Sequence, residues 1–205
     1  MKKKLNVLMA GLGLGVAFAC VAFAQNSGID FHNTITGEPL KFDEALPEGR
    51  DTPGVKKFMQ TGVNPYNEDK SCLKKGEQIF LSACSGCHGH IGEGKIGPGL
   101  NDDYWTYPEN ESDPGLFSTI FGGAKASMGP QYQSLKLDEM LQVMAWVRHI
   151  YKDSVDHAPW FTVEQKKNYK PYKQGEIFGD DPPGLCKKAA TPSEQRSSTG
   201  ENENE

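Results

Sequence analysis

The segment CSGCH at residues 84–88 constrains this chain most, because two cysteines and an adjacent histidine suit only a few kinds of site. A structural zinc site normally takes four ligands in two separated pairs, and no second Cys or His pair follows His88. A thioredoxin-like redox pair needs a strand–helix–strand context, whereas the preceding LKKGEQIFLSA has a helical pattern. CxxCH is also the attachment signature of c-type haem, in which two thioethers hold the porphyrin and the imidazole faces iron. We therefore expect Cys84 and Cys87 to tether one covalent haem c and His88 to bind its iron.

The N-terminus predicts export. Its residues MKKKLNVLMAGLGLGVAFACVAFAQ combine three lysines, a long uncharged run and an Ala-Phe-Ala site before Gln25, which is the pattern of a secretory signal. A membrane anchor is the alternative, but the glycines within the run favour cleavage, so we expect residues 1–24 to be removed together with Cys20. No second apolar run of membrane length follows. Because haem is attached to CxxCH outside the cytoplasm, export and the haem motif support each other.

The charge of the chain argues against a nucleic-acid partner. The formal net charge of −5 becomes three units more negative once the signal lysines are removed. Such a surface repels a phosphate backbone and favours solubility, or a partner with a positive patch. We therefore expect no nucleic acid and, after signal cleavage, no membrane as a partner.

Two cysteines are left outside the haem motif. Without Cys20 they are Cys72 and Cys186, and unassigned cysteines of an exported protein normally form a disulfide. Closing a loop of this length contributes about 4 to 5 kcal/mol in the chain-entropy model. The sequence predicts a Cys72–Cys186 disulfide that pins the C-terminal arm to the start of the core.

A sixth iron ligand distinguishes electron transfer from substrate binding, and the methionines are its candidates. Met140 and Met144 belong to a helical apolar stripe in SLKLDEMLQVMAWVRHIYKD, which predicts core packing. Met59 lies in a turn-rich region and is expected to pack at the periphery. Met128 lies in FGGAKASMGPQY, where glycines and a proline let the backbone approach a flat macrocycle, so we expect it to be the distal ligand. The remaining histidines lack a cysteine context and are expected to be surface or packing residues: His32, His90, His149 and His157.

Two further segments fit the same site. A metal-bound histidine usually donates its second ring N–H to a carbonyl or carboxylate, and the carbonyl of Pro98 in the GPGL segment is the candidate acceptor for His88. Gly76 and Phe80 are four residues apart on the helix before the motif, so they share a face. We expect this face to pack against the helix that carries Trp146.

The G-x-x-x-F helix, CxxCH, the GPGL loop, a glycine-flanked methionine and an aromatic C-terminal helix resemble a class I cytochrome c over about residues 71 to 152. The segments CSGCHGHIGEGKIGPGLNDDYWTYPENESDPGLFSTIFGGA and MGPQYQSLKLDEMLQVMAWVRHIY resemble the cytochrome cL family more specifically. In that family the axial positions fall on His88 and Met128. The resemblance implies a periplasmic protein that accepts single electrons from a PQQ-dependent quinoprotein methanol dehydrogenase and passes them to a smaller cytochrome c. Some family members also bind calcium beside the haem, so calcium is a further expected cofactor, without assignable ligands here.

These signals predict a mainly α protein with the class I cytochrome c fold and wrapped N- and C-terminal extensions. We expect a cleaved signal peptide at 1–24, an N-terminal extension at 25–70, the haem domain at 71–152, and a C-terminal arm with a low-complexity tail at 153–205. The N-terminal extension is expected to form loops laid over the core. Residues 101–115 are expected to form a polar and aromatic insertion beside the haem loops, in which the acidic residues are solvated and the aromatic residues either pack or seal the haem edge.

The predicted function is electron transfer rather than enzymatic catalysis. A filled sixth position leaves iron with nowhere to bind substrate, so no residue needs to act as a general acid or base. Two alternatives stay open. The donor could be a lanthanide-dependent or another periplasmic dehydrogenase, or the protein could be a small haem enzyme with a displaceable distal ligand.

Overall fold

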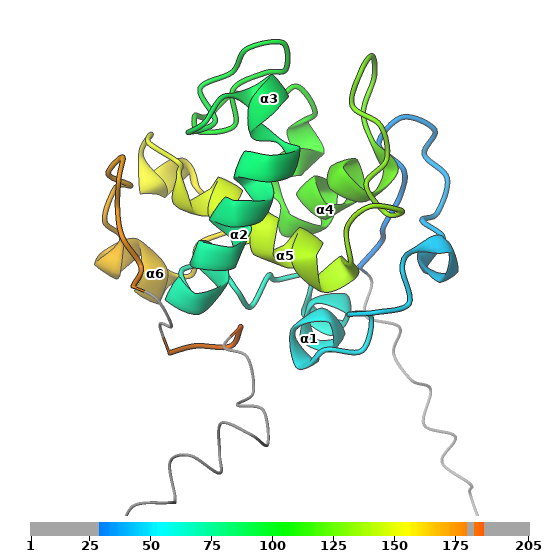
Figure 1. The fold of residues 1–205 in the computed structure, drawn as a ribbon, viewed down its shortest axis with the longest axis horizontal. Helices are drawn as coiled ribbons and strands as arrows, with labels where there is room; N and C mark the ends of the chain where they lie inside the picture. Colours follow the sequence, from blue (N-terminus) through cyan, green and yellow to red (C-terminus); the bar gives the residue numbers. More distant parts are fainter. Residues whose placement is uncertain (1–28, 180–182, 187–205) are drawn as a thin grey trace, which may run out of the picture.

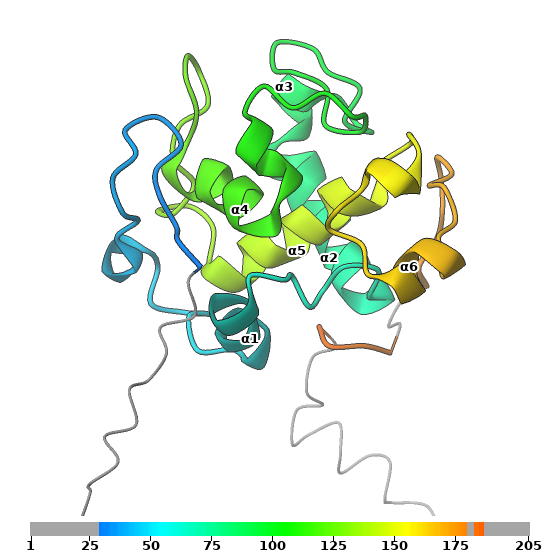
Figure 2. The same ribbon diagram turned by 180° about the vertical axis from the view of Figure 1, so that it is seen from behind.

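The computed structural model describes residues 29–179 and 183–186, and helices supply the regular structure of these ranges (Figures 1 and 2). In chain order the helices are η1 (Phe42–Glu44), α1 (Pro53–Thr61), α2 (Lys70–Ala83), α3 (Ser85–His88), η2 (Pro108–Glu111), α4 (Asp113–Gly122), α5 (Leu137–His149), η3 (Val155–His157) and α6 (Val163–Asn168). Within the described ranges the only β pairing is an isolated bridge between His32 and Pro39. The prediction of a mainly α fold is confirmed.

Helices α2 and α5 cross at the centre of the molecule and make its most extensive helix–helix contact within the described ranges (Figure 1). Gly76 lies at the crossing, where a Cβ would overlap the carbonyl oxygen of Gln142 and lie 3.1 Å from the Cβ of Trp146. Phe80, one turn further along α2, is fully buried. The missing side chain of Gly76 therefore lets the two backbones meet, as the spacing of Gly76 and Phe80 predicted.

Helix α1 lies in a segment that the sequence predicted to be loops, and this expectation is wrong for Pro53–Thr61. The Thr52 side chain caps the helix by accepting the Val55 N–H at 3.2 Å. A proline occupies the first position, where a missing N–H costs nothing, and Gly62 ends the helix with a φ of +67°. The helix is short, so its caps are stronger sequence signals than its apolar pattern.

The N-terminal extension is joined to the core by phenylalanines. Phe31 packs edge to face on Phe42, with ring centroids 5.5 Å apart. Phe58 of α1 lies 5.1 Å from Phe117 of α4, and Phe42 lies 5.5 Å from Phe121. Aromatic pairs of this kind contribute about 0.5–1.5 kcal/mol each beyond the burial of their area. The extension is therefore part of the hydrophobic core.

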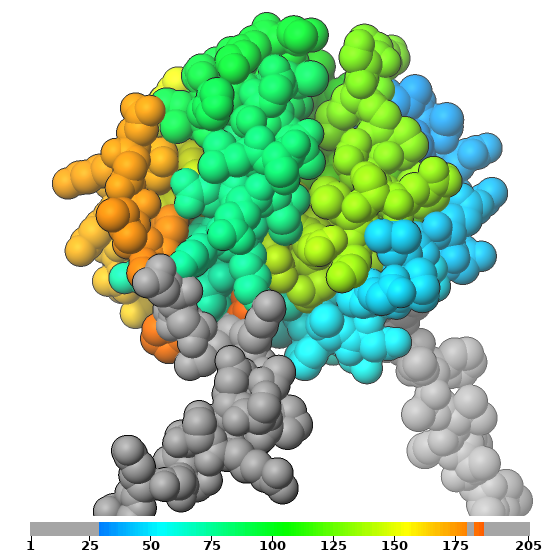
Figure 3. Space-filling view, viewed as in Figure 1, coloured from blue at the N-terminus to red at the C-terminus, as the bar shows by residue number. Residues whose placement is uncertain are grey.

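The C-terminal arm lies beside α2 and is tied to it by a disulfide (Figure 3). Cys72 in the first turn of α2 is bonded to Cys186, so the predicted pair is confirmed. Asp69 caps α2 by accepting the N–H groups of Ser71 and Cys72, and it also accepts the N–H of Leu185 at 2.9 Å. The start of α2 thus holds residues 185–186 of the arm in two ways. One is the disulfide, and the other is the Asp69 carboxylate, which caps α2 and also binds the backbone of the arm.

No helix within residues 29–179 and 183–186 is long and apolar enough to cross a membrane. The predicted signal at residues 1–24 and the low-complexity tail after Cys186 lie outside the described residues.

Candidate haem site

The CxxCH motif lies at the junction of α2 and α3. Cys84 follows the last residue of α2 and directly precedes α3. Its N–H donates to the carbonyl of Phe80 at 2.8 Å, and its own carbonyl accepts the N–H groups of Cys87 and His88 at 3.1 and 3.0 Å. The motif therefore continues the helical path of α2, which places two thiols and an imidazole on a single turn of backbone.

Both cysteines of the motif are free thiols. Cys84 is half-buried and Cys87 is exposed. Burial, helped by the neighbouring Cys87, raises the pKa of the Cys84 thiol to about 11. The two cysteines of the motif are separate from the Cys72–Cys186 disulfide, as two thioether bonds to a haem require.

The imidazole of His88 is oriented by the loop that follows it. His88 is 9% exposed, and its Nδ1 lies 2.9 Å from the carbonyl oxygen of Pro98. A carbonyl only accepts, so Nδ1 carries the proton and Nε2 keeps a free lone pair for a metal. Gly97 packs on the ring so closely that a Cβ there would lie 2.7 Å from Cε1 of His88. The ring therefore has a defined tautomer and a defined orientation.

Backbone hydrogen bonds hold this loop against the motif. The N–H of Gly94 donates to the carbonyl of His88 at 2.7 Å, and the N–H of Gly97 donates to the carbonyl of Cys87 at 2.9 Å. These bonds set the position of the Pro98 carbonyl relative to the imidazole through main-chain atoms. The orientation of His88 therefore depends on the backbone path of this loop and on the absence of a side chain at Gly97.

Met128 lies on the loop between α4 and α5. Gly123 follows α4 with a φ of +80°, a conformation that favours glycine. The N–H of Ala124 donates to the carbonyl of Met128 at 2.9 Å, which closes a compact loop, and the N–H of Gln131 donates to the carbonyl of Ile120 at 3.1 Å. The Met128 side chain is half-buried and packs against the core.

Helix α3 and the loop between α4 and α5 lie at the same end of the molecule in both ribbon views (Figures 1 and 2). In the space-filling view a cleft separates the green surface of α2 and α3 from the yellow-green surface of that loop (Figure 3). This end of the molecule contains two free thiols, one oriented imidazole and one methionine thioether. These residues fit a covalently bound haem c with two axial protein ligands.

A buried ion pair joins α4 to α5. Asp113 is 4% exposed and accepts a hydrogen bond from Nε of the fully buried Arg148 at 3.0 Å. The guanidinium lies 4.1 Å from the ring centroid of Trp160 and 5.2 Å from that of Trp105. Burial lowers the pKa of Arg148, and Asp113 opposes this shift. The expectation that the acidic residues of 101–115 are solvated is wrong for Asp113, which is buried against Arg148. The sequence did not reveal this burial, because Arg148 lies 35 residues further along the chain and no local pattern pairs the two residues.

His149 has a role beyond the surface or packing position that the sequence predicted. It is buried at the end of α5, with Nδ1 3.1 Å from Glu68 and Nε2 3.5 Å from Glu176 of the C-terminal arm. The arm also places the rings of Tyr172 and Phe178 at centroid distances of 5.8 and 5.7 Å from the imidazole. Burial lowers the pKa of His149, but the two carboxylates more than offset this and raise it above the ordinary value of 6.5.

Comparison with known proteins supports one family. Residues 72–147 match the family described as cytochrome c oxidase, cbb3-type, subunit III. Cytochrome c-L of Methylorubrum extorquens is 53% identical over 188 residues, which cover 90% of this chain and 95% of that protein.

Two crystal structures are also similar to this chain. Cytochrome cL from Hyphomicrobium denitrificans has 63% identity and a TM-score of 0.65, covering 70% of this chain and 86% of its own. Cytochrome cL from the marine methylotroph Methylophaga aminisulfidivorans has 52% identity and a TM-score of 0.67, covering 72% of this chain and 97% of its own. A cytochrome c domain implies covalent haem c and an electron carrier rather than an enzyme. The chain belongs to the cytochrome cL family of electron-transfer cytochromes c.

Proposed function

We propose that this protein is a periplasmic one-electron carrier that accepts electrons from a quinoprotein methanol dehydrogenase and passes them to a smaller cytochrome c. The donor and the acceptor are the partners implied by the resemblance to the cytochrome cL family. The observation that carries the proposal is the presence of an oriented His88 and the Met128 loop at one end of the molecule.

Each residue of the site has one role in this proposal. Cys84 and Cys87 form the two thioethers, which prevent loss of the group. His88 binds iron through Nε2, and the Pro98 carbonyl accepts its Nδ1–H, which fixes the tautomer and makes the imidazole a stronger electron donor. Met128 would supply the second protein ligand, which would leave neither water nor substrate a place on the metal. When bound, haem c supplies a one-electron iron couple, and a His/Met ligand pair raises its potential.

Electrons enter and leave near the CxxCH motif. Cys87 is exposed, and Ile96 in the neighbouring loop is 82% exposed. A group tethered here presents an edge to a partner within a small surface, which suits a transient redox complex. Exposed charges around such a complex are screened by salt, so its formation should depend on ionic strength.

Export to the periplasm is supported by three features. Residues 1–24 have the pattern of a signal peptide. The Cys72–Cys186 disulfide suits an oxidising compartment, and haem c is attached outside the cytoplasm. Calcium is a further cofactor that the resemblance implies, and no ligands are assigned to it: within the described ranges no group of three or more His, Cys, Asp or Glu side chains is placed to hold a metal ion.

Replacement of Met128 tests the axial assignment. Met128→Ala in the haem-containing protein should abolish the methionine-to-iron charge-transfer band and lower the reduction potential, because the sixth ligand is lost. Met59→Ala, at another half-buried methionine, should leave both unchanged. An unaltered spectrum of the Met128 variant would contradict the assignment.

Stopped-flow reduction tests the donor. The purified cytochrome is mixed with the PQQ-dependent methanol dehydrogenase and, separately, with a lanthanide-dependent one. Rapid reduction by the first enzyme supports the proposal, and reduction by the second alone assigns the donor to the alternative. Rapid binding of carbon monoxide by the ferrous wild-type protein would instead indicate a displaceable distal ligand and a small haem enzyme.

A further inference from the structure

Two adjoining hollows lie beside the start of α4. One has a volume of about 550 Å³ and the other about 460 Å³. Both are lined by Glu109, Ser112 and Pro114, so they flank the same turn of chain. Neither is lined by the residues of the candidate haem site. We refer to the two hollows together as the Glu109 groove.

The larger hollow has an apolar and well-anchored wall. Trp160 and Phe161 are buried, and the Trp160 ring packs edge to face on Tyr151 at 5.0 Å while covering the Arg148 guanidinium at 4.1 Å. Val63 lines the same hollow and is 48% exposed. Three prolines complete the apolar lining: Pro108, Pro114 and Pro159. Rigid aromatic rings beside exposed apolar surface are typical of sites where another protein docks.

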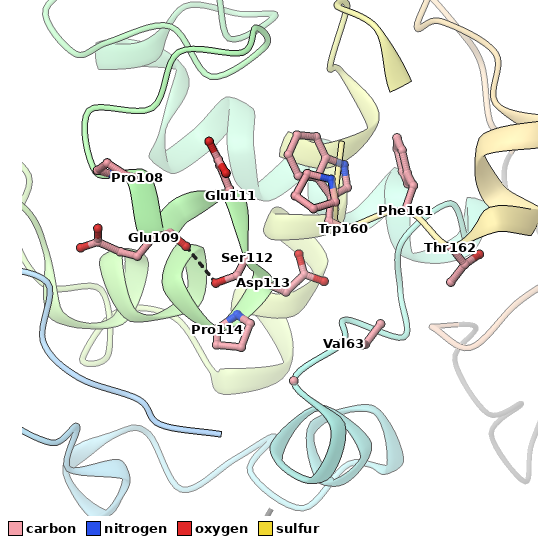
Figure 4. A pocket seen from close by; sticks show the side chains of 12 residues that line it. Val63, Pro108, Glu109, Glu111, Ser112, Asp113, Pro114, Trp160, Phe161 and Thr162 are labelled. Carbon is pink, nitrogen blue, oxygen red and sulfur yellow. Dashed lines mark hydrogen bonds between the residues drawn. The ribbon is translucent and has the colours of Figure 1, made fainter. Parts of the chain in front are cut away.

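The rim of the groove is negatively charged. Glu109 and Glu111 both line the larger hollow; in Figure 4 the Glu111 carboxylate lies on the side of η2 nearer to Trp160, and the Glu109 carboxylate points away from the rings. Both glutamates are exposed, and neither carboxylate forms an ion pair with another described residue. No lysine or arginine lines either hollow. Uncompensated carboxylates around an apolar hollow are complementary to a segment that combines apolar and basic side chains.

We propose that the Glu109 groove binds an extended basic segment of the donor dehydrogenase, as a contact separate from the one at the haem edge; this inference rests on the proposed function. A partner that reaches both the groove and the CxxCH surface needs a large interface. A dehydrogenase can provide such an interface, whereas a small cytochrome c docks through a small one. The groove contributes affinity and orientation, and electrons pass at the haem edge.

Charge reversal in the groove tests this inference. The variant Glu109→Lys with Glu111→Lys should raise the Kd of the wild-type dehydrogenase complex about tenfold at low salt, because two attractive contacts become repulsive. The electron-transfer rate within the saturated complex, the reduction potential and the reoxidation by the small cytochrome c should stay unchanged. The matched control is Asp43→Lys with Glu48→Lys, an identical charge change at two exposed carboxylates outside the groove.

The outcomes separate this inference from the proposed function. If the wild-type protein is reduced and the groove variant has the same Kd, the groove inference alone fails. The groove inference also fails if the control variant loses as much affinity for the dehydrogenase, since the effect then comes from net charge. It fails as well if reoxidation by the small cytochrome c slows equally, since the groove would then not be specific to the dehydrogenase. If the dehydrogenase does not reduce the wild-type protein at all, the proposed function fails and the inference fails with it.

Discussion

The two extensions of the haem domain are held by different interactions. The N-terminal extension packs through Phe31, Phe42 and Phe58 into the aromatic core. The C-terminal arm also buries aromatic rings, at Trp160 and Phe161, but its later part is held by the Cys72–Cys186 disulfide and by the ion pair between Glu176 and the buried His149. Burial of aromatic rings depends on neither pH nor reductant, whereas a disulfide is broken by reductant and a histidine ion pair is lost as the pH rises. The later part of the C-terminal arm therefore depends on a covalent bond and an ion pair in addition to packing, whereas the aromatic packing of the N-terminal extension needs no covalent bond.

The largest effect is expected at the N-terminal extension. Phe58→Ala should lower the free energy of unfolding by about 3–5 kcal/mol, because the fully buried ring leaves a cavity between α1 and α4. Denaturant unfolding at two pH values, with and without reductant, should give the same loss. Lys57→Ala, exposed on the same helix, should change the free energy by less than about 0.5 kcal/mol. A loss that disappears in reductant would contradict the contrast between the extensions.

Removal of the disulfide should have the next largest effect. The variant Cys72→Ser with Cys186→Ser should lose about 2–4 kcal/mol of stability, the usual measured range and less than the chain-entropy model gives, because the unfolded chain is no longer closed into a loop. Hydrogen exchange should increase in residues 170–179 and stay unchanged in α1. Peptide mapping of the wild-type protein without reduction should recover the two cysteines in one linked species. An equal increase of exchange in α1 would show that the extensions are not held independently.

The smallest effect is expected from the titration of His149. Because Glu68 and Glu176 raise the pKa of His149 in the folded state, its stabilisation is fully present below the ordinary value of 6.5 and is lost as the pH rises through the raised pKa. Glu77 on α2 also faces this charge. The protection of residues 170–179 against hydrogen exchange, corrected for the intrinsic pH dependence of amide exchange, should therefore decrease as the pH rises in the wild-type protein. The variant His149→Gln should lack this pH dependence, and parallel profiles for the two proteins would exclude a role of the ion pairs.

The sequence predicted the central packing well, because short-range patterns encode it. Gly76 and Phe80 lie on one face of one helix, and their spacing predicted the α2–α5 crossing that the structure contains. The disulfide followed from counting cysteines in an exported chain. By contrast, α1 was missed because its main signals are a capping threonine, a first-turn proline and a final glycine. Each of these also occurs in loops.

The sequence by itself predicted the haem-binding chemistry of this chain, because CxxCH places both thiols and the imidazole within five consecutive residues. Only the tertiary structure decided which charges are buried. Asp113 meets Arg148, and His149 meets Glu68 and Glu176, across long stretches of chain. It also showed that Glu109 and Glu111 rim an apolar hollow. The physical reason is that burial and ion pairing depend on which segments pack together, and no periodicity within one segment specifies its neighbour.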